Sequence, residues 1–189
     1  MVKEIIFALV AKEKNQVLCE FTEHRGNFET IAQGILQKVK ENSRATIVFE
    51  NEYFFYYLNK EGITGLCLCD QYFPKDSAFI FLEELIDALL QKFTKSEIQK
   101  ERAYSKVFSD IFSPIIKEKI SKYNRNPEAS DSMKLLKKGV LEYKDNVFKA
   151  NEILLERELK LNLVVQKSEA LKVESTAYYD SVRNKLIII

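Results

Sequence analysis

The sequence has little of the residues on which most catalytic and metal sites depend. It contains one histidine, His24, three cysteines, five glycines and no tryptophan. It has no glycine-rich phosphate loop, no histidine or cysteine nucleophile setting and no metal-ligand spacing. We therefore expect a protein that is not an enzyme and that holds no cofactor and no metal.

The three cysteines, Cys19, Cys67 and Cys69, lie in β-rich runs. Cysteine in such a run is usually a small buried hydrophobe, and an odd number does not indicate a disulfide framework. Cys67 and Cys69 share one face of a predicted strand, as two metal ligands would, but no second cysteine pair completes a site. The sequence favours a structural role for all three.

An excess of charge and long apolar runs are also missing. The formal net charge is +1, from 29 basic and 28 acidic residues, which argues against nucleic-acid binding. The apolar run 5–11 is too short for a signal peptide, so we expect the chain to begin in the cytosol. Residues 186–189 are apolar, but a membrane span needs ~20 residues. No C-terminal prenylation cysteine is present.

Residues 1–122 carry the pattern of an α+β domain. Asn27 is a plausible N-cap for an amphipathic helix at residues 28–39. A second helix follows Pro74, with Asp76 or Ser77 as its cap, and we expect a solvated face at Glu83, Glu84 and Asp87. A third helix near residues 107–120 contains Pro114, which should kink or split it. Five β-rich runs predict a five-stranded antiparallel sheet, at residues 5–11, 17–21, 46–49, 53–58 and 63–69.

Residues 133–182 carry a different pattern. Apolar or small residues recur at alternating steps of three and four, which is the spacing of a coiled-coil seam. The segment has no proline, and as one helix it would be ~75 Å long, too long to pack on its own small domain. Its partners must therefore be other helices. The seam residues are Met133, Leu136, Val140, Tyr143, Val147, Ala150, Leu154, Leu161, Val164, Ser168, Leu171, Ser175, Tyr178 and Val182.

Arg157 interrupts this seam with a permanent charge and five hydrogen-bond donors. Burying a guanidinium without partners is unfavourable by several kcal/mol, so the facing helices should present oxygens at that layer. Such a polar layer fixes the register. An ordinary dimeric or trimeric coiled coil, with the arginine at its rim, is the alternative interpretation.

The residues around Arg157, from Glu156 to Leu171, resemble the centre of an R-SNARE motif, closest to the vesicle-associated membrane protein 7 class. In that family the arginine meets three glutamines from partner helices in a four-helix bundle, and zippering draws two membranes together. The resemblance implies that Arg157 is the zero-layer residue and that the partners are glutamine-bearing SNARE proteins. Glu158 and Lys185 depart from the family pattern, and Lys185 falls at the last seam step.

The order of elements in residues 1–122 resembles the longin domain, a profilin-like fold. Gly26-Asn27-Phe28 and the run 78–82 are similar to its turn and second-helix signatures. A longin domain followed by an R-SNARE motif is a combination of this family. The resemblance predicts a longin domain at 1–122, a linker at 123–131, the R-SNARE coiled-coil helix at 132–186 and the start of a membrane anchor at 187–189, with an unanchored form as the alternative.

The resemblance also implies a function. A longin R-SNARE acts in vesicle fusion on the cytosolic face of vesicle, endosomal, lysosomal or vacuolar membranes, and its longin domain regulates assembly and binds trafficking adaptors. A cytosolic coiled-coil scaffold or trafficking adaptor with a longin domain is the alternative.

A seam tethered by a short linker experiences a high effective concentration near its own domain. We expect Val140, Tyr143, Val147 and Leu154 to dock there and to compete with partner helices. The resemblance indicates a receiving surface near the first helix and third strand, formed by Ile31, Ile35, Ile47 and Phe49. An independent domain on a loose tether is the alternative.

Overall fold

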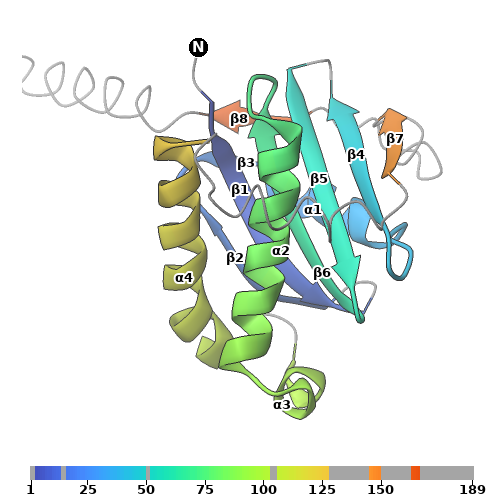
Figure 1. Ribbon diagram of the computed structural model, residues 1–189, viewed down its shortest axis with the longest axis vertical. Coiled ribbons are helices and arrows are strands. Elements are labelled where there is room, and N and C mark those ends of the chain that lie inside the picture. The colour runs from blue at the N-terminus through green and yellow to red at the C-terminus, as the bar shows by residue number, and fades with distance from the viewer. Residues whose placement is uncertain are drawn as a thin grey trace, which may run out of the picture.

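The structure is a computed structural model that describes residues 3–13, 16–49, 52–102, 106–127, 145–149 and 163–166. Its centre is a mixed sheet in the order β2-β1-β6-β5-β4-β7 (Figure 1). Every neighbouring pair is antiparallel except β4 and β7, which are parallel. The five-stranded antiparallel sheet predicted from the sequence is confirmed, and β7 extends it by one strand. The strands are β1 (Ile5–Lys12), β2 (Gln16–Thr22), β4 (Arg44–Phe49), β5 (Tyr53–Lys60), β6 (Ile63–Asp70) and β7 (Asp145–Lys149).

The helices cover both faces of this sheet. α2 and α4 lie side by side in front of it in Figure 1, while α1 lies behind it. A separate two-stranded ribbon pairs β3 (Arg25–Gly26) with β8 (Val165–Gln166). The helices are α1 (Phe28–Leu36), α2 (Lys75–Lys92), α3 (Lys95–Lys100) and α4 (Lys106–Arg125).

The central strands β1 and β6 are buried along their whole length. Because side chains alternate between the faces of a strand, they supply apolar groups to both sides of the sheet. Val10 and Cys67 pack into a core cluster beneath α2 and α4. Leu9 and Leu66 pack into the opposite cluster, beneath α1, which we call the α1 core.

The start of α2 differs from the sequence prediction. The helix begins at Lys75, and Pro74 is its N-cap in an extended conformation. Asp76 therefore falls in the first turn, where a carboxylate still complements the helix dipole. Ser77 is fully buried, and its hydroxyl donates to the carbonyl of Pro127.

The helix α4 continues through Pro114 and ends at Arg125, so the proline does not split it. It extends into the segment that the sequence predicted as linker, because two of its last residues are held by the domain. The Tyr123 ring packs edge-on against Phe81 at 5.4 Å. The Asn124 side chain accepts from the Ile5 N–H at 2.7 Å and donates to the Ile5 carbonyl at 3.2 Å.

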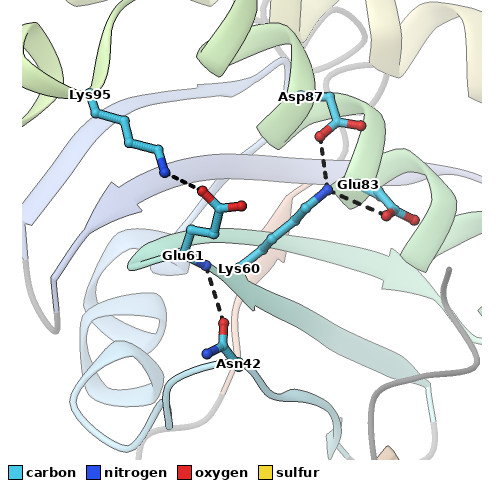
Figure 2. A network of polar contacts seen from close by, with 6 residues as sticks. All are labelled: Asn42, Lys60, Glu61, Glu83, Asp87 and Lys95. Carbon is cyan, nitrogen blue, oxygen red and sulfur yellow. Dashed lines mark hydrogen bonds and ion pairs between the residues drawn. The ribbon is translucent and has the colours of Figure 1, made fainter.

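The acidic residues of α2 do not form the solvated face that we expected. Glu83 is only 7% exposed. Lys60 Nζ lies between its carboxylate, at 3.6 Å, and that of Asp87, at 3.1 Å (Figure 2). Burial raises the pKa of Glu83 although Lys60 opposes the shift. On the other flank Glu84 pairs with Lys119 at 3.2 Å, so β5 and α4 partly cover both sides of α2.

The turn between β5 and β6 links this network to α3. Glu61 pairs with Lys95, next to the Thr94 N-cap of α3, and its N–H donates to Asn42 Oδ1 at 3.3 Å (Figure 2). These contacts fix one end of the sheet, opposite the end where α4 closes over Ile5. Hydrogen bonds therefore join neighbouring elements at both ends of the sheet, with an ion pair at the α3 end.

Glu20 of β2 makes the stability of this domain depend on pH. Burial, followed by repulsion from Glu29, raises its pKa from the ordinary 4.5 to about 7. Since the folded-state pKa lies above the unfolded one, folding disfavours the charged form, and stability should fall as pH rises from 4.5 to about 7. We expect Glu20→Gln to reduce this fall, measured as thermal midpoints across that range. The control is Glu118→Gln on the exposed face of α4, and an unchanged slope in Glu20→Gln would contradict the assignment.

Candidate functional site

Two segments from the C-terminal third of the chain pair with the N-terminal domain. In the first, which we call the edge contact, β7 lies parallel to β4. The register runs from Arg44 opposite Asp145 to Val48 opposite Lys149, with Val147 opposite Thr46. A strand at the edge of a sheet presents unpaired N–H and C=O groups, and β7 supplies partners for those of β4.

Arg44 marks one end of the edge contact. Its guanidinium lies over the Phe79 ring of α2, 4.8 Å from the centroid, on the face of the sheet opposite α1. Its Nε and Nη1 are shielded from solvent and have no hydrogen-bond partner within the described part of the chain. The residue in register with it, Asp145, is acidic.

The second pairing, which we call the turn contact, joins residues 163–166 to the turn before α1. Gly26 stands opposite Val165 in the β3–β8 ribbon, and the Val164 N–H donates to Asn27 Oδ1 at 2.8 Å. Leu163 and Val165 pack against the α1 core, while Val164 between them is 46% exposed. This alternation is that of a strand with one buried face.

Gly26 permits this close approach. A Cβ there would lie 2.2 Å from the Val164 carbonyl oxygen and 2.4 Å from the Phe28 ring. Contacts under 3.0 Å force a neighbour to move, and one of these neighbours is backbone. Only glycine lets the segment lie this close to the turn.

Asn27 is the predicted N-cap of α1, and the structure assigns it that position. Its carbonyl accepts from the Ile31 N–H at 3.3 Å, as an N-cap carbonyl should. Its side-chain oxygen, however, is directed at Val164 instead of the first turn of the helix. One asparagine therefore joins α1 to the C-terminal segment.

The sequence predicted helix at the seam residues Val147 and Val164, but neither lies in a helix. Val147 belongs to β7, and Val164 immediately precedes β8. An isolated seam cannot bury its apolar stripe, whereas pairing with a sheet provides backbone hydrogen bonds at once. The remaining predicted residues lie outside the described part of the chain: Met133, Leu136, Val140, Tyr143, Ala150, Leu154, Arg157, Leu161, Ser168, Leu171, Ser175, Tyr178 and Val182.

The residues predicted to receive the seam are members of the α1 core. Ile31, Ile35 and Ile47 are fully buried, and Phe49 is almost so. Among the described side chains of the C-terminal segment, those of Leu163 and Val165 pack against this cluster, and neither is a predicted seam residue. The apolar, partly β-branched run 163–165 was the available signal for an extended segment.

The described residues contain no group of three or more histidine, cysteine or acidic side chains that could hold a metal ion. The Sγ atoms of Cys67 and Cys69 lie 3.9 Å apart and are buried. Burial raises the pKa of the Cys69 thiol well above its ordinary value. A metal ligand must be a thiolate, so this environment disfavours coordination. None of the described helices is long and apolar enough to cross a bilayer.

Comparison with known proteins gives one family. Residues 18–115, more than half of the chain, match the longin model, described as a regulated-SNARE-like domain. Vesicle-associated membrane protein 7 of Gallus gallus is 29% identical over 95% of this chain and 80% of its own length. Vesicle-associated membrane protein 712 of Arabidopsis thaliana is 28% identical over 87% and 73%, respectively. Synaptobrevin homolog YKT6 of Yarrowia lipolytica is 25% identical over 82% and 76%.

Substituting Gly26 tests the turn contact. Gly26→Ala places a Cβ against the Val164 carbonyl and the Phe28 ring, so residues 163–166 should lose protection from amide hydrogen exchange by roughly tenfold or more. The clash with Phe28 should also lower the stability of the domain, by about 1–3 kcal/mol. Hydrogen exchange and thermal unfolding measure the two effects, with Thr30→Ala on the exposed side of α1 as control. Unchanged protection of residues 163–166 would show that the close approach at Gly26 does not hold the segment.

Proposed function

This chain belongs to the longin family of R-SNAREs, and we propose that residues 132–186 contribute one arginine-bearing helix to the four-helix bundle that drives vesicle fusion. The observation that carries the proposal is the combination of a longin fold with a seam interrupted only by Arg157. In this role the longin domain, residues 1–122, regulates assembly and sorting. No catalytic step is required of the chain.

Arg157 is the proposed zero-layer residue, facing three glutamines from partner helices. A guanidinium offers five donors, and glutamine side-chain carbonyls accept hydrogen bonds without adding charge to the interface. Three such acceptors satisfy most of the guanidinium N–H donors. The matched bundle is therefore more stable than one with an apolar layer opposite the arginine. The partners are therefore glutamine-bearing SNARE proteins.

Regulation follows from competition for the same residues. Val147 and Val164 face partner helices in the proposed bundle, but in this structure Val147 lies in a strand beside β4 and the Val164 N–H donates to Asn27. A residue cannot occupy a strand and a helix together, so the docked form and the bundle exclude each other. The docked form holds the chain closed until partner helices or an adaptor shift the balance.

The relatives indicate work in vesicle and endomembrane traffic. Within that traffic we propose the cytosolic face of vesicle, endosomal, lysosomal or vacuolar membranes. The longin domain is the proposed binding site for trafficking adaptors.

Sedimentation and circular dichroism test the proposal against a scaffold that self-associates. We expect the chain to sediment as a monomer, and to gain helicity when it is mixed with three glutamine-bearing SNARE helices, because the seam becomes buried only in the bundle. The isolated segment 133–182 should likewise be largely unfolded until the partners are added. A stable homo-oligomer, or high helicity that partners do not change, favours the scaffold and contradicts the SNARE role.

Arg157→Leu tests the polar layer. An apolar residue removes the donors that require facing oxygens, so the variant should bind helices carrying leucine at the central layer as readily as those carrying glutamine. We expect its preference for matched over unmatched helices to fall by roughly tenfold, or about 1.4 kcal/mol. Competition binding measures the ratio of affinities for matched and unmatched helices. Arg157→Lys, which keeps the charge but loses the planar guanidinium, is the control. Equal selectivity in Arg157→Leu and the parent chain argues against a register role.

A further inference from the structure

The two contacts lie on opposite sides of Arg157 in the sequence. The edge contact takes residues 145–149, before the arginine, and the turn contact takes residues 163–166, after it. They also use different parts of the domain, since β4 belongs to the six-stranded sheet and β3 belongs to a separate ribbon. Figure 1 draws β7 and β8 at separate places on the domain.

We propose that the closed form opens in two separable steps, with the turn contact acting as an independent latch on the half of the seam that follows Arg157. The inference rests on the proposed function, because it concerns the segment assigned there to the SNARE helix. Its consequence is a half-open state, in which residues up to the arginine layer have joined a bundle while residues 163–166 remain on the domain.

The chemistry of the two contacts supports their independence. The edge contact consists of backbone pairing along one strand of the sheet. The turn contact combines the two residue pairs of the ribbon with a side-chain acceptor, Asn27, and two apolar side chains that pack on the α1 core. The hydrogen-bonded pairs of the two contacts involve different residues of the domain, so breaking the pairs of one contact removes no hydrogen-bond partner from the other.

The chain between the contacts is long enough for the half-open state. Leu163 lies six residue steps after Arg157, and six steps span up to roughly 20 Å when extended. A helix that ends at the arginine layer can therefore leave β4 while Leu163 stays in place. Continuing the helix past Leu161 would pull Val164 from Asn27, so completing the bundle requires release of the latch.

Hydrogen exchange on the full chain tests independence without any partner protein. Val164→Pro removes the N–H that donates to Asn27, and it changes no residue of the domain, so it cannot prevent the domain from folding. We expect exchange to rise by roughly tenfold at residues 25–26 and 163–166, with residues 44–49 and 145–149 unchanged within about twofold. Val164→Ala keeps the N–H and is the matched control.

Val147→Pro provides the converse variant, because a proline inside a short strand interrupts its ladder. It should deprotect residues 145–149 and those amides of residues 44–49 that face β7, and it should leave residues 163–166 protected, with Val147→Ala as its control. If either proline variant deprotects both contacts together, or if Val164→Pro leaves residues 163–166 protected, the two-step proposal is overturned.

The second experiment adds glutamine-bearing SNARE helices to the parent chain. Helices that end at their central glutamine should deprotect the amides of residues 44–49 that face β7 and leave residues 163–166 protected, whereas full-length helices should deprotect both sets. Short helices that release both contacts overturn the latch. Failure of every SNARE helix to bind overturns the proposed function instead, and the proline variants then still decide whether the contacts are independent.

Discussion

The structure depends on a sheet whose central strands are apolar on both faces. β1 and β6 are buried throughout, so neither face can be left to water. One face receives α2 and α4, which are 18 and 20 residues long, but the other receives α1, which has nine. A nine-residue helix is ~14 Å long, while six strands at ~4.8 Å extend ~24 Å. The α1 core therefore gains from further apolar cover, and Leu163 and Val165 supply part of it.

The same sheet explains why a segment built for a coiled coil can adopt strands. β4 is the last strand of the antiparallel part, and an edge strand pairs with any extended chain of suitable length. Main-chain pairing makes few demands on side chains, so residues chosen for a helical seam can satisfy it. The turn contact is more selective, because it needs glycine at position 26 and an acceptor at position 27.

Much of the fold could be predicted because its signals are local. The five antiparallel strands, the first helix and its Asn27 N-cap follow from β-rich runs, short turns and apolar periodicity. The burial of Glu83 could not be predicted, because the residue that pairs with it, Lys60, is far away in the sequence. The strands β7 and β8 escaped prediction for a related reason. A spacing of three and four describes a helix, and nothing local to Val147 shows that β4 offers an open edge.

Asn27 has a consequence for the energetics of opening. Its side-chain oxygen serves Val164 in the docked form, and an asparagine in the N-cap position can instead accept from the second or third N–H of its own helix. When the segment leaves, the side-chain oxygen of Asn27 can therefore accept from N–H groups in the first turn of α1 instead. N-cap bonds contribute about 1 kcal/mol, so much of what the lost hydrogen bond gave is recovered by the helix. An asparagine that exchanges hydrogen-bond partners in this way would lower the net free energy needed to undock the chain.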